Sequence, residues 1–244
     1  MQLMIWECQC YLPVIDYLDT DGRSNQSKDR YPPNMATNSL RVATVDNPLK
    51  CAILISGSGS GMEAMLRHQQ ESNCLHTTCV VISNQPDVLG INRAKQFGTP
   101  VVVVELPINL EGRARRLAHE VAIEKVLHQH SVELIILSGY MRLLSPEIVS
   151  RWAGQIVNIH PSLLPDFPGA HAHRDVIAAG ATKSGCSVHY VDAGMDTGKI
   201  IAQREVSVGL DDTEETLSAK VKQIEHRLYP IVIDAIASGD YSNL

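Results

Sequence analysis

Short apolar segments alternate with helical patterns along this chain from residue 50 to about residue 160. The apolar segments are uniformly hydrophobic, which is typical of strands buried on both faces, and they cover 51–55, 78–82, 101–104, 134–137 and 156–159. Helical patterns separate them, near 61–71, 88–97, 113–130 and 145–152. This alternation predicts an α/β fold with a doubly wound, mostly parallel, Rossmann-like sheet, whose ligands bind beyond the carboxyl ends of the strands.

The pattern changes in the last third of the chain. Two extended segments, 185–192 and 198–207, predict an antiparallel addition to the sheet. A long closing helix follows, with an apolar stripe formed by Leu217, Val221, Ile224, Leu228 and Val232. Asp212 and Glu215 predict a capping box at the start of this helix, and Pro230 predicts a kink within it.

The length of 244 residues fits one α/β domain. Residues 19–33 are polar and contain Pro and Gly without a period, so we predict that 1–49 is a flexible N-terminal extension and 50–244 the folded domain. The first 18 residues are more apolar and could instead pack on the domain or on another subunit.

Charge and composition restrict the partners. A net charge of −6 without blocks of Lys or Arg argues against nucleic acid, and no apolar run reaches the roughly 18 residues of a membrane helix. The six cysteines form no C-x-x-C pair and the chain begins without a secretory pattern, so a cytoplasmic location is predicted. The sequence does not indicate the oligomeric state.

Polar side chains follow the apolar run at 156–159. Asn158 and His160 are two residues apart, so on a strand they point the same way, and Asp196 follows the extended segment 185–192. Amide and imidazole donors stabilise an oxygen that gains negative charge, while a carboxylate favours the charged imidazole. This set suits acyl or formyl transfer.

A glycine-rich loop, SGSGSG at 56–61, follows the first predicted strand and opens the first predicted helix. Backbone N–H groups at a helix start favour a phosphate, with a plain tight turn as the alternative explanation of the glycines. The loop lacks the Lys of a nucleotide P-loop and the G-x-G-x-x-G spacing, so ATP and NAD are poor candidates.

Three stretches carry a family resemblance, in the order SGYMRLLSP, NIHPSLLPDFPGAHAHRD and SVHYVDAGMDTG. They resemble the folate-dependent formyltransferases, most closely the phosphoribosylglycinamide (GAR) formyltransferases of purine synthesis, from about Lys50 to Gly239. The resemblance implies that 50–244 is a catalytic domain with Asn158, His160 and Asp196 as its catalytic set. It also implies a reaction in which 10-formyltetrahydrofolate, as co-substrate, gives its formyl group to the amine of GAR, without a metal.

The resemblance also implies binding residues. For GAR these are Gly59, Ser60, Gly61, Lys222 and Glu225, and Gly61 stands where the family commonly has Asn. For the folate they are Arg116, Met141, Arg142, Leu143, Leu144 and Asn158. Three alternatives stay open: a solvated ion pair at 222 and 225, a core turn at 140–144, and a folate contact by Arg113 or Arg115 in place of Arg116.

Histidines occur at further family positions. His189 matches an active-site histidine of the family, and His171 matches the family's loop after the catalytic strand. Both are assigned supporting roles, although His189 between valines also fits a satisfied core residue. His171 with His173, and the pair at 128 and 130, lack a third ligand at a standard spacing, so no metal is predicted there.

Other functions fit the sequence less well. A formyltetrahydrofolate hydrolase carries an N-terminal regulatory domain and a His-His pair where this chain has His160-Pro161. A tRNA formyltransferase needs a basic C-terminal domain. A non-catalytic folate- or phosphate-binding module has no use for an intact Asn158, His160 and Asp196.

Overall fold

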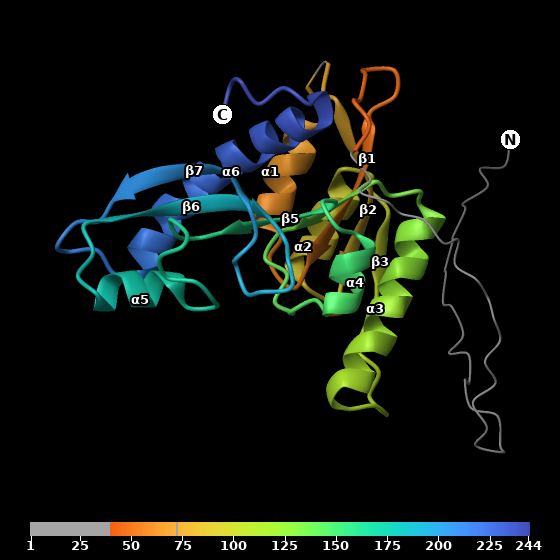
Figure 1. Cartoon of the computed structure of the whole chain (residues 1–244), viewed down its shortest axis with the longest axis horizontal. Coiled ribbons are helices and arrows are strands. Elements are labelled where there is room, and N and C mark those ends of the chain that lie inside the picture. The colour runs from red at the N-terminus through yellow and green to blue at the C-terminus, as the bar shows by residue number, and fades with distance from the viewer. Residues whose placement is uncertain (1–39, 72) are drawn as a thin grey trace, which may run out of the picture. The chain divides into compact units, whose positions relative to one another are not determined.

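The computed structural model describes residues 40–71 and 73–244, so the prediction for residues 1–39 lies outside the described part of the chain. One seven-stranded sheet has the order β3-β2-β1-β4-β5-β6-β7 (Figure 1). The strands are β1 Leu49–Ile55, β2 His76–Ser83, β3 Val101–Val103, β4 Leu134–Leu137, β5 Ile156–His160, β6 Lys183–Tyr190 and β7 Ile200–Ser207. Pairs among β1 to β5 are parallel, and β6 and β7 add antiparallel, which confirms the predicted fold.

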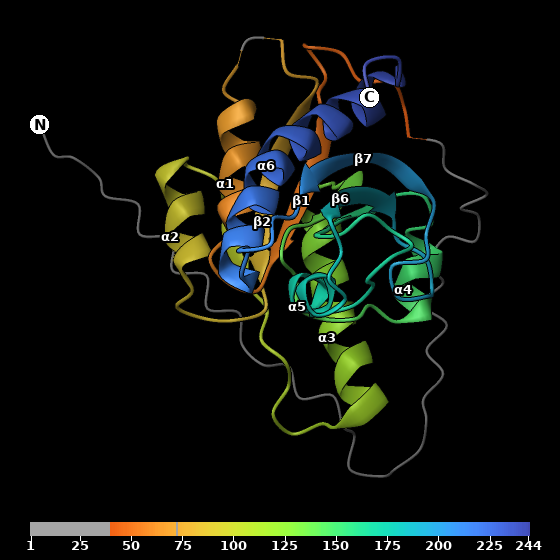
Figure 2. The same cartoon turned by 90° about the vertical axis from the view of Figure 1, so that its left-hand side faces the viewer.

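Helices cover both faces of the sheet. The helices are α1 Ser60–His68, α2 Leu89–Gln96, α3 Gly112–Gln129, α4 Pro146–Arg151, α5 Ala172–Ala178 and α6 Glu214–Ser238. Side by side, α1 and α6 pack on one face, while α3 and α4 pack on the other (Figure 2). The short α5, which the sequence analysis did not predict, adds Val176 to the α6 side, and α6 continues through Pro230 without a break.

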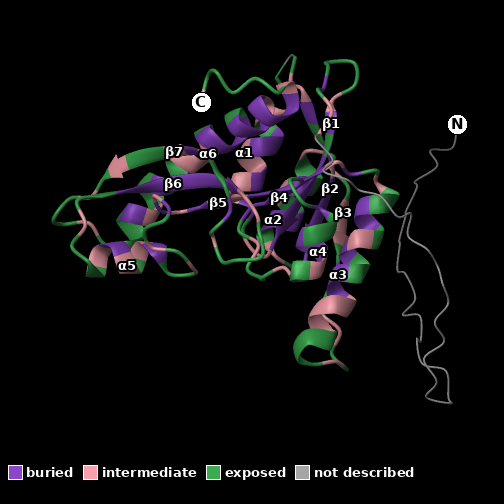
Figure 3. Cartoon of the chain, viewed as in Figure 1, coloured by how far each residue is buried: buried purple, intermediate pink, exposed green. Residues whose placement is uncertain are grey.

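Two apolar layers hold the sheet between the helices, and Figure 3 shows the buried strands at the centre. Ile53 and Val232 belong to the layer under α1 and α6, whereas Leu54 and Ile123 belong to the layer under α3. Each fully buried side chain of this kind contributes about 1.5–3 kcal/mol. Burial on both faces explains why the strand sequences are uniformly apolar.

The start of α6 differs from the prediction. Thr213 is the N-cap, and its hydroxyl accepts a hydrogen bond from Thr216 N–H at 3.3 Å, while Thr216 Oγ1 accepts from Thr213 N–H at 2.9 Å. The predicted box of Asp212 and Glu215 is therefore wrong by one position. The Asp212 carboxylate instead accepts from Lys220 Nζ at 2.6 Å, so a side-chain ion pair takes the place of a backbone cap.

Residues 40–48, at the end of the predicted extension, contact the domain. The Arg41 guanidinium donates to both carboxylate oxygens of Glu133 at 2.6 and 2.8 Å. Ala43 is buried, and its N–H donates to the carbonyl of Ala237 at 2.7 Å. No helix in the described residues is long and apolar enough to cross a membrane.

Candidate active site

The pairing of β5 with β6 brings the predicted amide and imidazole groups together. Asn158 lies opposite His189, and His160 lies opposite Ser187, all on one face of the sheet. His189 Nδ1 is 2.9 Å from the carbonyl of Tyr190 and therefore donates to it. His189 Nε2 lies 3.2 Å from the Asn158 amide nitrogen, from which it accepts when the ring is neutral, and it faces Asp196 as a donor when the ring is charged.

Asp196 lies between two imidazoles. It occupies the left-handed region, with φ of 57°, in the loop after β6. Its Oδ2 is 3.4 Å from His160 Nδ1, and its Oδ1 is 3.6 Å from His189 Nε2. Hydrogen bonding with His189 lowers the pKa of the Asp196 carboxyl, whereas burial opposes this shift. A hydrogen bond from the Gly169 N–H, at 2.9 Å, lowers the pKa further. The carboxylate is thus ionised at neutral pH.

His160 has acceptors at both ring nitrogens. The residue is 4% exposed, and its Nε2–H donates to the carbonyl of Phe167 at 2.9 Å while Nδ1 faces Asp196. A doubly protonated imidazolium satisfies this arrangement with both of its N–H groups. The structure therefore brings together the predicted trio of Asn158, His160 and Asp196.

Hydrogen bonds from β6 and β7 hold the loop that follows His160. Ser187 Oγ donates to the carbonyl of Ser162 at 2.7 Å and accepts from Leu164 N–H at 3.0 Å. Gln203 Nε2 donates to the carbonyl of Leu164 at 2.9 Å. Ser187 and Gln203 were not predicted from the sequence, although a Ser within an apolar strand, two residues before His189, indicates an inward-facing hydroxyl.

The glycine-rich loop leads from β1 into α1. Gly59 is the N-cap in the left-handed region, with φ of 67°, and a Cβ there would lie 2.8 Å from Gly90 Cα, so only Gly fits. Ser60 begins the helix, whose free N–H groups suit an anion. Ser56 Oγ accepts from Met141 N–H at 2.8 Å, which ties this loop to the loop after β4.

Gly61 and Ser138 are neighbours in space. A Cβ built on Gly61 would lie 2.7 Å from Ser138 Oγ, at the end of β4. The Ser138 hydroxyl thus fills the space into which a side chain at position 61 would extend. This pairing was not predicted, because no local sequence pattern connects Gly61 with Ser138.

A groove of about 690 Å³ begins at Ser60 and runs between α1 and α6. Arg67, Arg93, His226 and Arg227 contribute to its lining. Arg93 also fixes the glycine-rich loop, since its guanidinium donates to the carbonyl of Ser58 at 3.1 Å. These basic residues were not predicted, because they are scattered over α1, α2 and α6.

Lys222 and Glu225 do not share a solvated face. Lys222 is exposed and Glu225 is partly buried, and among the described residues no ion pair joins them. Burial raises the pKa of Glu225 to about 7 against the opposing charge of Lys222. The charge of Lys222 adds to burial in lowering the pKa of both His173 and His226.

The predicted folate residues after β4 are mostly on the surface. Met141 is 73% exposed, Leu143 is 64% exposed, Arg142 is exposed, and Leu144 packs partly into the core. The alternative of a core turn is therefore wrong for Met141 and Leu143. An exposed apolar pair beside a cation suits a ligand surface.

The three arginines near the start of α3 have different surroundings. Arg113 forms an ion pair with Glu147, whereas Arg116 is partly buried. Burial lowers the pKa of His119, and the charges of Arg142 and Arg115 add to this effect. His171, assigned a supporting role, is exposed at the N-cap of α5.

Comparison with known proteins identifies the family. A family model described as Formyl transferase matches residues 49–233. The chain belongs to the formyl transferase family. The phosphoribosylglycinamide formyltransferase of Bacillus subtilis (strain 168) is 42% identical over 184 residues, 75% of this chain and 92% of that protein. The one of Escherichia coli (strain K12) is 37% identical over 193 residues, 78% of this chain and 88% of that protein.

Longer relatives and solved structures agree with this family. The trifunctional purine biosynthetic protein adenosine-3 of Gallus gallus is 42% identical over 193 residues, and the chain spans 19% of its length. The crystal structure of phosphoribosylglycinamide formyltransferase from Brucella melitensis superposes with a TM-score of 0.73 at 39% identity. That match covers 79% of this chain and 97% of the other.

Proposed function

We propose that this formyl transferase moves the formyl group of 10-formyltetrahydrofolate to the amine of GAR, in the cytoplasm, as a step of de novo purine synthesis. One observation carries the proposal. An ionised Asp196 lies between His160 and His189, beside the Asn158 amide, at the carboxyl end of β5. Relatives similar over most of their length carry the name phosphoribosylglycinamide formyltransferase.

The reaction begins when the amine of GAR attacks the formyl carbon. A new C–N bond forms, and the carbonyl oxygen becomes an oxyanion in a tetrahedral intermediate. Asn158 Nδ2 has a second hydrogen beyond the one that faces His189, so it can donate to this oxygen. Both N–H groups of His160 already face acceptors, so His160 stabilises the oxyanion mainly through its positive charge.

The intermediate then breaks down. The bond between the formyl carbon and the folate nitrogen N10 breaks, and the amine loses one proton while N10 gains one. Asp196 keeps His160 charged and can relay the proton through a water molecule. Formyl-GAR and tetrahydrofolate are the products, and no metal takes part.

Substrate binding follows from the surroundings of this centre. The N–H groups at Ser60 and Gly61 and the charge of Lys222 bind the phosphate of GAR, and the Ser138 hydroxyl replaces the contact that Gly61 cannot make. Glu225, also on α6, binds near the glycinamide amine. For the folate we assign Met141, Arg142, Leu143 and Leu144, together with Asn158 and Arg116.

The decisive experiment measures folate release with and without GAR. We expect release from 10-formyltetrahydrofolate only when GAR is present, with formyl-GAR detected by mass spectrometry. Equal release in both mixtures would reassign the protein to the hydrolase class, and binding without release would make it a non-catalytic module.

A matched pair of lysine variants tests the GAR site. Lys222→Ala should raise the KM for GAR about 10–100-fold, because a charged hydrogen bond contributes about 1.5–3 kcal/mol, and should leave the KM for the folate unchanged. Lys220→Ala is the control, since Lys220 is on the same helix but pairs with Asp212. An unchanged KM for GAR in Lys222→Ala would leave this lysine a surface residue.

A further inference from the structure

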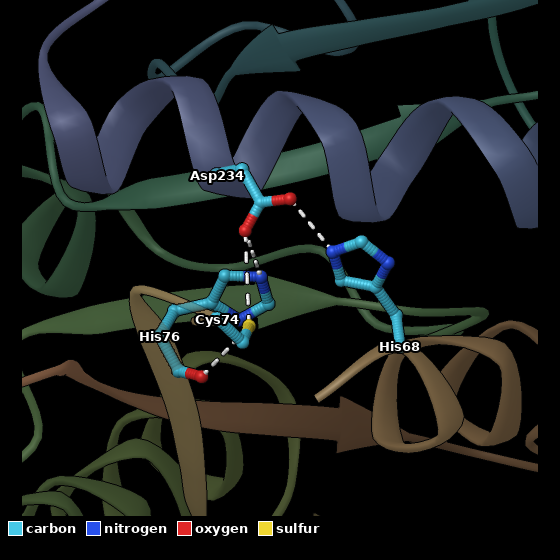
Figure 4. A group of neighbouring side chains, drawn as sticks. All are labelled: His68, Cys74, His76 and Asp234. Carbon is cyan, nitrogen blue, oxygen red and sulfur yellow. Dashed lines mark hydrogen bonds and ion pairs between the residues drawn. The ribbon is translucent and has the colours of Figure 1, made fainter. Parts of the chain in front are cut away.

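A second cluster of titratable side chains lies at the opposite end of the sheet (Figure 4). His68 ends α1, His76 begins β2, and Cys74 lies in the loop between them. Asp234 reaches this group from α6, so three elements meet there. The proposed reaction at the carboxyl ends of the strands uses none of these residues.

The four side chains offer the atoms that bind transition metals. One ligand atom from each lies within 4.8 Å of all the others. Asp234 Oδ2 is 2.6 Å from His68 Nε2, and its Oδ1 is 3.2 Å from His76 Nε2 and 3.7 Å from Cys74 Sγ. Metal–ligand distances of about 2.0–2.3 Å in a tetrahedral zinc site imply ligand separations of about 3.3–3.7 Å. Shifts of about 1 Å or less would therefore produce that geometry.

His76 gives a second, independent indication that this cluster binds a metal ion. Its side chain is fully buried, and its Nε2 lies 3.2 Å from Asp234 Oδ1 without the alignment of a hydrogen bond. This nitrogen points into the cluster, toward Asp234. A buried nitrogen with a poorly aligned partner loses hydrogen-bond energy, and a metal ion would bind this nitrogen directly.

Both histidines present Nε2 to the cluster and Nδ1 to a polar side chain behind it. His68 Nδ1 faces the Glu71 carboxylate at 3.9 Å, and His76 Nδ1 faces the Gln69 amide nitrogen at 2.8 Å. Metal-binding histidines usually donate their second N–H to an acceptor, which fixes the ring orientation. The Glu71 carboxylate can accept such an N–H from His68, whereas the Gln69 amide nitrogen is a donor and fits His76 only in the metal-free state.

We propose that His68, Cys74, His76 and Asp234 form a binding site for a divalent transition metal, with Zn²⁺ the best fit. Two imidazoles, a thiolate and a carboxylate are the donor set of tetrahedral zinc. On binding, the Cys74 thiol loses its proton to solvent, and the proton of His76 moves from Nε2 to Nδ1. All four positions are taken by protein, so the site is structural and joins α6 to α1 and β2.

Gln69 sets the affinity of this site. Its Oε1 accepts from Thr78 N–H at 3.0 Å, so its amide nitrogen faces His76 Nδ1 and keeps the His76 proton on Nε2. Metal binding must turn this amide over and break the bond to Thr78. A carboxylate at position 69 would accept from both Thr78 N–H and His76 Nδ1–H without turning.

A solvent route to the cluster exists. A cavity of about 350 Å³ is lined by His68, Cys74 and Asp234 and, near its exposed rim, by Glu71 and Asp240. The added carboxylates favour a cation over an anion. In the metal-free state burial raises the pKa of the Cys74 thiol, so the metal must displace a proton to bind there.

The test is metal binding by the full chain after chelation. We expect about one Zn²⁺ per chain in competition with a chromogenic chelator, and with Co²⁺ the thiolate charge-transfer band and the strong visible bands of a tetrahedral site. Cys74→Ser should lose the charge-transfer band and weaken binding about 10-fold or more, whereas Cys79→Ser, a cysteine outside the cluster, should bind normally. A Co²⁺ spectrum without a thiolate band in the wild-type protein would overturn the proposal.

Gln69→Glu and Gln69→Leu sharpen the test. Gln69→Glu should bind Zn²⁺ about 10–100-fold more tightly than the wild-type protein, whereas Gln69→Leu should bind Zn²⁺ no more tightly than the wild-type protein. If Zn²⁺ affinity is the same in wild-type, Gln69→Glu and Cys74→Ser proteins, the cluster is only a hydrogen-bond network. The readout is independent of formyl transfer, so failure here leaves the proposed function untouched.

Discussion

Two carboxylates of this protein each lie between two imidazoles, at opposite ends of one sheet. Asp196 contacts His160 and His189 at 3.4 and 3.6 Å, whereas Asp234 contacts His68 and His76 at 2.6 and 3.2 Å. The chemistry of the trio is the same, so its neighbours must decide what each cluster does.

The neighbours differ in kind. The Asn158 amide stands beside the first trio, and Asp196 projects from a loop beyond the strand ends, where a substrate can approach. The Cys74 thiol stands beside the second trio, and Asp234 projects from α6 near the C-terminal end of that helix. An amide at an open end favours oxyanion stabilisation, while a thiol among elements packed together favours a closed set of metal ligands.

The largest expected effect separates the two clusters directly. His160→Ala should lower kcat about 10³-fold or more, because it removes the charge that stabilises the oxyanion. His68→Ala, the matched change in the other cluster, should leave kcat within about two-fold. Steady-state kinetics would measure kcat in both variants, with circular dichroism as a check on folding. An active, folded His160→Ala protein would contradict the mechanism.

Asp196→Asn should be the next most severe change. On the proposed mechanism it lowers kcat about 10²-fold or more, since an amide cannot keep His160 charged. The pKa of Asp196 is held below its usual value, so its contribution to stability is present above a pH of about 3.9 and is lost as the pH falls through the lowered pKa. Asp196→Asn should therefore flatten the acid side of the stability curve in urea unfolding, and an unchanged curve would refute the coupling.

How far the sequence predicted the first cluster depends on distance along the chain. Asn158 and His160 were predictable because a spacing of two on a strand puts both on one face. The contact of Asn158 with His189 was not, because it depends on the antiparallel register of β5 and β6, which no local pattern sets. The pairing of Gly61 with Ser138 is likewise made by the adjacency of β1 and β4.

The second cluster shows the same limit more strongly. His68, Cys74 and His76 are close in sequence but have no standard metal spacing, and Asp234 joins them only because α6 packs beside α1. At the start of α6 the prediction failed by one residue, because Thr213 competes with Asp212 for the cap and a side-chain ion pair satisfies Asp212. Strands buried on both faces were predictable, since their uniformly apolar sequences indicate that burial directly.

A smaller effect is expected at the phosphate loop. Gly61→Asn alone should raise the KM for GAR about ten-fold, because its Cβ meets the Ser138 hydroxyl at 2.7 Å. In the double variant with Ser138→Ala the space is free, and the KM should return toward the wild-type value. Ser138→Ala alone should raise it a few-fold by removing one hydrogen bond. Additive effects in this cycle would show that the two positions are independent.

The smallest effect on activity is expected from Asp234→Asn, the exact counterpart of Asp196→Asn. The kcat for formyl transfer should stay within about two-fold, because the proposed reaction takes place at the other end of the sheet. Stability should fall by about 1–3 kcal/mol, since the buried His76 and the neighbouring His68 lose a charged partner. Urea unfolding measures this loss, and added Zn²⁺ should stabilise the wild-type protein more than the variant. Equal losses of kcat in the two Asp→Asn variants would mean that the two ends of the sheet are coupled, and the contrast between an open catalytic trio and a closed ligand set would fail.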